Sequence, residues 1–164
     1  MDFALTEPVR LLMVMLPKFT FPNRFVLPLT VKFAPTYMLF AVDANGADKA
    51  MQTYFAQHQY ANVLVYCTAG DCRNNVGRWP IRPVDAPHRA RDFAFFTAKD
   101  AAMAEDADVG LALWDGQSTG TLVNVARLVA RSKPAVVYIA PTRTFSTLKT
   151  PDDLVMLLSA ADAD

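Results

Sequence analysis

The chain has 164 residues, of which 52% are hydrophobic and 20% charged. This length suits one domain of ordinary size, so we expect a single domain over residues 1–164. The composition excludes disordered, collagen-like and low-complexity proteins. The 16 Lys and Arg residues balance the 16 Asp and Glu residues, for a formal net charge of zero. Because nucleic acids and anionic membrane surfaces attract an excess of positive charge, neither is an expected partner.

Residues 1–36 carry β-branched and aromatic runs that prolines interrupt, at Pro17, Pro22, Pro28 and Pro35. Central strands and helices do not accept proline, so edge strands and extended segments are expected here, where the β-branched and aromatic runs cover residues 10–16 and 24–31. The same interruptions keep each apolar stretch below the ~18 to 20 residues of a spanning helix, so no membrane crossing is expected. An apolar arm of this kind suits a dimer interface and predicts a homo-oligomer.

From residue 37 onward, short apolar runs alternate with segments of helical spacing. The expected strands cover residues 37–42, 62–68, 109–114 and 134–140. The expected helices cover residues 46–60, 89–107 and 118–132, with a last one opening at Thr150, and residues 69–88 are expected to form a long loop. This alternation predicts an α/β fold over residues 37–160: a three-layer Rossmann-like domain whose mostly parallel sheet is covered by helices on both faces.

Two cysteines, Cys67 and Cys72, lie five residues apart. A bridge between them would close only a small loop, so free thiols and a cytoplasmic location are expected. No second Cys or His pair completes a tetrahedral site, so neither a metal nor another cofactor is expected.

Three small, polar loops follow the predicted strands, over residues 43–49, 70–75 and 115–121. In a parallel sheet, ligands bind outside the carboxyl ends of the strands. The expected ligand-binding residues in and beside these loops are Asp43, Asn45, Gly46, Asp48, Arg73, Asn75, Trp114, Gly116, Ser118, Gly120, Thr121 and Asn124.

The loop over residues 115–121 is the most informative of the three. Its glycines permit close approach of the backbone, and Ser118 and Thr121 supply hydroxyls at the start of a helix, where an anion or phosphate is readily held. The alternative is a simple turn at Asp115 with Ser118 as the helix cap. Trp114 could stack on a ring or belong to the core, and Trp79 is the tryptophan expected to be exposed.

Three segments occur in an order typical of one superfamily. They are Gly46-Ala-Asp48-Lys49, then Lys99-Asp100-x-x-Met103 followed by Ala107-Asp108, and Trp114-Asp-Gly-x-Ser-x-Gly-Thr121. With these segments, residues 38–158 resemble the SLOG proteins. This superfamily comprises Rossmann-like nucleotide-binding domains, among them the DprA and LOG families and, more distantly, the nucleoside deoxyribosyltransferases and deoxynucleotide N-hydrolases.

The resemblance implies a nucleotide or nucleoside phosphate as ligand. The glycosidic relatives place a catalytic glutamate where this chain has Asn124, and an amide is neither a carboxylate nucleophile nor a base. We therefore expect nucleotide binding without the glutamate-dependent chemistry. One alternative is an N-glycosidic hydrolase or deoxyribosyltransferase that acts on nucleoside monophosphates, with Asp100 or Asp115 as the catalytic carboxylate. The other is a non-catalytic protein-interaction module.

Overall fold

The computed structural model describes residues 9–14, 37–43, 47–70, 72–86 and 93–161, which form a mixed α/β fold. The strands are β1 Val9–Val14, β2 Tyr37–Val42, β3 Val63–Thr68, β4 Ile81–Val84, β5 Val109–Trp114, β6 Ala135–Ile139 and β7 Thr144–Leu148. The helices are α2 Ala47–Gln57, α3 Phe93–Asp106, α4 Thr119–Val129 and α5 Pro151–Ala161.

The described strands form a seven-stranded sheet in the order β4-β3-β2-β1-β5-β6-β7. Neighbouring strands are parallel from β4 to β6, and β7 is antiparallel to β6. Because β2, β3 and β5 point the same way, their carboxyl ends lie at one edge of the sheet. The loops that follow these three strands therefore start from the same edge, as the sequence predicted.

Successive side chains of the inner strands enter two different apolar cores. In β3, Tyr66 belongs to one core, whereas Val65 and Cys67 belong to the other. In β5, Trp114 and Leu113 divide in the same way. This alternation follows from the period of two along a strand, and it explains why these strands read as continuous apolar runs.

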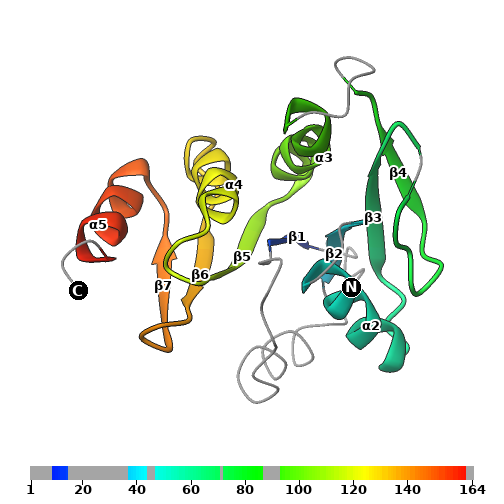
Figure 1. The fold of residues 1–164 in the computed structure, drawn as a ribbon, viewed down its shortest axis with the longest axis horizontal. Helices are drawn as coiled ribbons and strands as arrows, with labels where there is room; N and C mark the ends of the chain where they lie inside the picture. Colours follow the sequence, from blue (N-terminus) through cyan, green and yellow to red (C-terminus); the bar gives the residue numbers. More distant parts are fainter. Residues whose placement is uncertain (1–8, 15–36, 44–46, 71, 87–92, 162–164) are drawn as a thin grey trace, which may run out of the picture.

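Helices lie on both sides of the row of strands (Figure 1). Helices α3, α4 and α5 follow one side, and α2 lies on the other beside β2 and β3. Met103 from α3 and Val125 and Leu128 from α4 enter the first core, whereas Met51 and Phe55 from α2 enter the second. None of the helices in the described residues is both long and apolar enough to cross a membrane.

Three strands differ from the sequence-based expectation. The N-terminal strand β1 was expected at an edge, but it lies between β2 and β5 in the middle of the sheet. The prolines that suggested an edge all follow β1 in the sequence, and none of them interrupts it. Strand β4 lies within the segment expected to be a loop and contains Pro83, which an outermost strand accepts. Strand β7 was not expected, and its residues are mostly exposed.

The last helix begins where the sequence predicted. The Thr150 hydroxyl accepts a hydrogen bond from the Asp153 N–H at 3.2 Å. The Asp153 carboxylate accepts in return from the N–H groups of Lys149 and Thr150 at 2.8 and 2.9 Å. These bonds lower the pKa of Asp153, that from Lys149 most, and they satisfy donors that the start of a helix leaves free.

The contact between β5 and α4 provides a test of the fold. A Cβ at Gly110 would lie 2.2 Å from Leu128 Cδ1, so the Leu128 side chain occupies the space that a side chain at this position would need. We expect Gly110→Ala to lower the free energy of unfolding by about 1–3 kcal/mol in urea titrations. Leu128→Ala alone costs about 2–5 kcal/mol, and the double variant should lose clearly less than the sum of the two. Strictly additive losses would contradict this packing.

Candidate functional site

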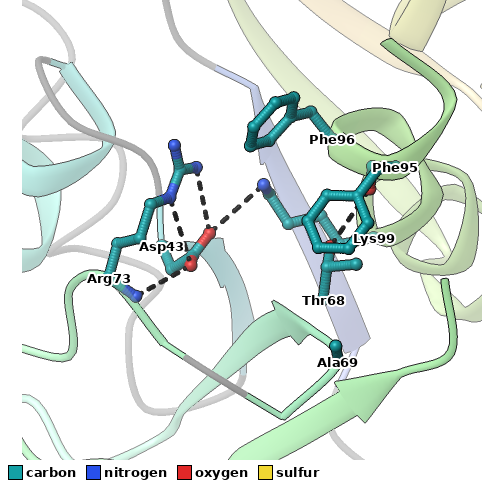
Figure 2. A pocket seen from close by; sticks show the side chains of 7 residues that line it. All are labelled: Asp43, Thr68, Ala69, Arg73, Phe95, Phe96 and Lys99. Carbon is teal, nitrogen blue, oxygen red and sulfur yellow. Dashed lines mark hydrogen bonds and ion pairs between the residues drawn. The ribbon is translucent and has the colours of Figure 1, made fainter. Parts of the chain in front are cut away.

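The carboxylate of Asp43, just after β2, is buried and paired with two cations (Figure 2). The residue is 2% exposed. Lys99 Nζ lies 3.2 Å from Asp43 Oδ1, and Arg73 Nη2 lies 3.3 Å from the same oxygen. Asp43 Oδ2 accepts the backbone N–H of Arg73 at 2.9 Å. A carboxylate with these partners has little capacity left for a ligand, so Asp43 orients two cations.

Burial alone would raise the pKa of Asp43. The Arg73 N–H, the Arg73 guanidinium and the Lys99 ammonium together outweigh burial, so the pKa of Asp43 is lowered from its usual value. The carboxylate is therefore the form that the surroundings stabilise.

A small pocket opens beside these charges. Its volume is about 70 Å³, which is room for a few waters or one small polar group and far below the size of a typical ligand cavity. We call it the Arg73–Lys99 pocket, and its walls come from the ends of β2 and β3 and the first two turns of α3 (Figure 2). The lining residues are Asp43, Thr68, Ala69, Arg73, Phe95, Phe96 and Lys99.

Aromatic and hydroxyl groups complete the walls of this pocket. Phe96 is 38% exposed, with the Arg73 guanidinium carbon 5.5 Å and Lys99 Nζ 5.9 Å from its ring centroid. The Thr68 hydroxyl donates a hydrogen bond to the Phe95 carbonyl oxygen at 3.3 Å. Both cations therefore lie near the same aromatic ring, which cannot neutralise either of them.

Two further acids interact electrostatically with the same cluster, Asp48 in the first turn of α2 and Asp100 in α3. Burial raises the pKa of Asp48 well above its usual value, and the nearby charge of Asp100 raises it further. Burial also raises the pKa of Asp100, although Lys99 and a hydrogen bond from Asn124 oppose that change. The two neighbouring aspartates therefore hold their protons to a higher pH than Asp43 does.

Asn124 connects Asp100 to α4. The residue is 8% exposed, and its side-chain oxygen accepts a hydrogen bond from Arg127 Nη1 at 2.6 Å. Its amide group also hydrogen-bonds the Asp100 carboxyl. Thr121 lies one helical turn earlier on α4 and is also buried, with its hydroxyl 3.4 Å from that of Ser118. A row of polar groups therefore runs from the start of α4 to Asp100.

The loop between β5 and α4 leaves the start of that helix open. Asp115 Oδ1 accepts the N–H groups of Gln117 and Ser118 at 2.9 and 2.7 Å, so this carboxylate shapes the turn. Gly116 adopts φ +85°, which a glycine accepts without strain. Ser118 is the N-cap residue but makes no side-chain cap hydrogen bond. A Cβ at Gly120 would meet no atom of the described residues within 4 Å, so the first turn of α4 is open on this side.

The segment after β3 is ordered by its own side chains. Asn75 Oδ1 accepts the Trp79 N–H at 2.9 Å, and Asn75 Nδ2 donates to the Trp79 carbonyl oxygen at 2.8 Å. Buried Gln52 receives the Val76 N–H at 2.9 Å, and Asn74 donates to the Asp43 carbonyl oxygen at 2.8 Å. The expected ligand-binding amide of Asn75 thus holds the loop that positions Arg73.

Two expectations for aromatic residues are corrected here. Trp79 was expected to be exposed, but it is 7% exposed and donates from Nε1 to the Tyr60 carbonyl oxygen at 2.8 Å. Trp114 is 2% exposed and packs in the first core, so its ring does not form a surface on which a base could stack. Among the described residues, the Trp114 indole N–H has no hydrogen-bond partner.

The prediction of free thiols is wrong, because Cys67 and Cys72 form a disulfide. Their Cα atoms are 5.1 Å apart, within the usual range for such bonds. The turn after β3, with Ala69 and Gly70 at φ +57° and +74°, brings the chain back on itself and closes the distance. The thiol-based reason for a reducing cytoplasm therefore no longer applies.

The structure brings together Asp43, Asp48, Arg73, Asp100 and Asn124 of the expected site. Asn45 and Gly46 lie outside the described residues. Sequence reasoning missed Lys99, Thr68 and Phe96. Lys99 belongs to the Lys99-Asp100-x-x-Met103 segment, and its position beside Asp100 was the available signal, but its burial in α3 at 4% exposure is a tertiary property.

Comparisons with known proteins add no assignment. The chain matches no protein-family model, and a search of curated proteins finds no match. Within the described residues, no group of three or more His, Cys, Asp or Glu side chains is arranged to hold a metal ion. The candidate site is therefore defined by its own geometry.

Because its pKa is raised, replacing Asp48 with asparagine should increase stability at neutral pH, whereas replacing an ordinary aspartate at the start of a helix should decrease it. A folded-state pKa above the unfolded value means that stability falls as the pH rises from about 4 through the folded pKa. We expect Asp48→Asn to raise the melting temperature at pH 7.5, with a smaller gain at pH 4. The control is Asp152→Asn at the exposed start of α5, which should lose roughly 0.3–1 kcal/mol at pH 7.5. A loss of stability in Asp48→Asn at pH 7.5 would contradict the prediction.

Proposed function

We propose that this chain binds a nucleotide or a nucleoside phosphate at the carboxyl edge of its sheet. The observation that carries the proposal is the open start of α4 beside a row of buried polar groups. The open side of the helix at Gly120, and a Ser118 hydroxyl that makes no cap hydrogen bond, suit an anion at the first N–H groups of α4. The row from Thr121 through Asn124 to Asp100 offers partners for sugar hydroxyls.

The strand order supports a doubly wound, three-layer Rossmann-like fold as the frame for this site. The chain winds outward from β1 through β2 and β3 to β4, and then returns to the other side of β1 with β5 and β6. In such sheets the ligand crevice forms where the winding reverses, outside the carboxyl ends of the two strands concerned. Here that place is between β1 and β5, and the loop after β5 leads into α4. With the proposed resemblance to SLOG proteins, we expect the phosphate of a nucleotide to bind at this loop.

A substitution at Gly120 tests the proposal without threatening the fold. We expect a panel of nucleoside mono- and diphosphates to raise the melting temperature of the unaltered protein, because a ligand of the native state stabilises it. Gly120→Asp places a negative charge at the start of α4, where it favours the helix but repels a phosphate. We expect this variant to fold and to lose at least tenfold in nucleotide affinity by calorimetry.

Gly120→Ala is the matched control, since a methyl group here meets no neighbouring atom and alanine favours a helix. It should retain binding within about threefold. A flat response of the unaltered protein across the panel overturns the proposal and favours the protein-interaction module.

Hydrolysis of an N-glycosidic bond is a second candidate, favoured by the environment of Asp100. A half-buried carboxyl with a raised pKa suits a general acid, and Asn124 bonded to it occupies the position of the relatives' glutamate. The other carboxylate considered, Asp115, already accepts two backbone N–H groups in its turn. We expect any release of free base from nucleoside monophosphates, followed by chromatography, to disappear in Asp100→Asn. No release at high protein concentration removes this candidate.

The remaining expectations stay predictions. The apolar arm that suggested a homo-oligomer falls within residues 1–36, most of which lie outside the described part. A cytoplasmic location now rests on no observation of the cysteines, since these are paired.

A further inference from the structure

The Arg73–Lys99 pocket has more positive charge than its own carboxylate neutralises. Lys99 and Arg73 contribute two positive charges, and Asp43 contributes one negative charge that both contact. Among the described residues, Asp48 and Asp100 are the other acids that act on this cluster, and neither of them lines the pocket. The immediate walls of the pocket therefore favour one added negative charge.

Lys99 has donors to spare. An ammonium group carries three N–H bonds and accepts none. Within the described residues, the ammonium group forms one ion pair, with Asp43 Oδ1, and it also lies near the ring of Phe96. The residue is 4% exposed and lines the pocket, so bulk water cannot serve it freely. A buried ammonium group that faces a cavity and has unused donors is stabilised when an acceptor binds inside that cavity.

Arg73 completes a two-sided arrangement. Its side chain is 41% exposed and reaches Asp43 from the loop after β3, whereas Lys99 reaches the same carboxylate from α3 (Figure 2). Its Nη2 contact with Asp43 is 3.3 Å and its Nε contact 3.5 Å, both longer than a strong charge-assisted bond. In the described part of the chain, Arg73 Nη1 donates to no acceptor. The guanidinium can therefore turn part of its donor fork toward a second oxyanion.

We propose that Arg73 and Lys99 bind one small oxyanion in this pocket, a phosphate or carboxylate group, and that Asp43 is a positioning residue that holds both cations in place. The size of the cavity, about 70 Å³, fits such a group and not a whole nucleoside. This subsite is separate in its residues from the start of α4. It deepens the proposed function by giving the ligand a second anionic contact, but binding of a free oxyanion here does not require that a nucleotide binds.

The direction in which one substitution changes the anion affinity distinguishes this role from a purely structural one. Asp43→Asn keeps the shape of the side chain but removes the charge that competes for the two cations. A structural salt bridge predicts only lost stability, because two buried or half-buried cations lose their partner. An oxyanion subsite predicts that the same variant, although less stable, binds the anion more tightly.

The experiment measures the rise in melting temperature with inorganic phosphate and, separately, with acetate, each against chloride at equal ionic strength. Calorimetry then gives the affinity of whichever anion stabilises the protein. We expect a stabilising shift for the unaltered protein, at least a fivefold loss of affinity in Arg73→Gln, and at least a threefold gain in Asp43→Asn. Arg131→Gln, an exposed arginine just after α4, is the control and should leave the affinity unchanged.

Three results overturn the proposal: no shift beyond chloride for either anion, equal affinities in Arg73→Gln and Arg131→Gln, or no gain in a folded Asp43→Asn. If Asp43→Asn does not fold, Arg73→Gln and its control decide the matter. The outcome is independent of the nucleotide test. Gly120→Asp should keep the anion response, and an anion response without any nucleotide response rejects the proposed function but supports this subsite.

Discussion

The buried carboxylate of Asp43 is the charge around which the candidate site is arranged. Arg73 reaches it from the loop after β3 and Lys99 reaches it from α3, so one ion pair network joins three elements that are far apart in the sequence. Buried ion pairs add little net stability, because desolvation offsets their attraction. Their effect is to fix direction, because both cations are held where they line one pocket.

The sheet supplies the rigidity that this arrangement needs. Strands β3, β5 and β6 contribute side chains to two separate apolar cores, so their carboxyl ends cannot shift independently. Residues placed just beyond these ends inherit that rigidity. The loop that carries Arg73 is held in addition by Asn75, Trp79 and Gln52, and by the disulfide that ends at the residue before Arg73.

Acidic groups in the site divide into two kinds. Asp43 is stabilised as a carboxylate by cations, whereas burial pushes Asp48 and Asp100 toward their protonated forms. Environments that separate the pKa values of neighbouring carboxyls are common at functional sites, although structural networks also produce them. Asn124 on α4 hydrogen-bonds Asp100 on α3. It therefore connects the helix whose start is proposed to bind the nucleotide with the helix that carries Lys99.

The sequence by itself determined the strands β2, β3, β5 and β6, the helices between them, and the edge at which Asp43, Arg73 and the loop at Asp115 begin, because hydrophobic periodicity and turn residues are local properties. It also selected Asp48, Asp100 and Asn124. Only the tertiary structure decided that β1 is central, that Trp79 and Lys99 are buried, and that Cys67 meets Cys72. Those outcomes depend on which segments pack together, and a proline, an indole, an ammonium or a thiol carries no record of its distant neighbours.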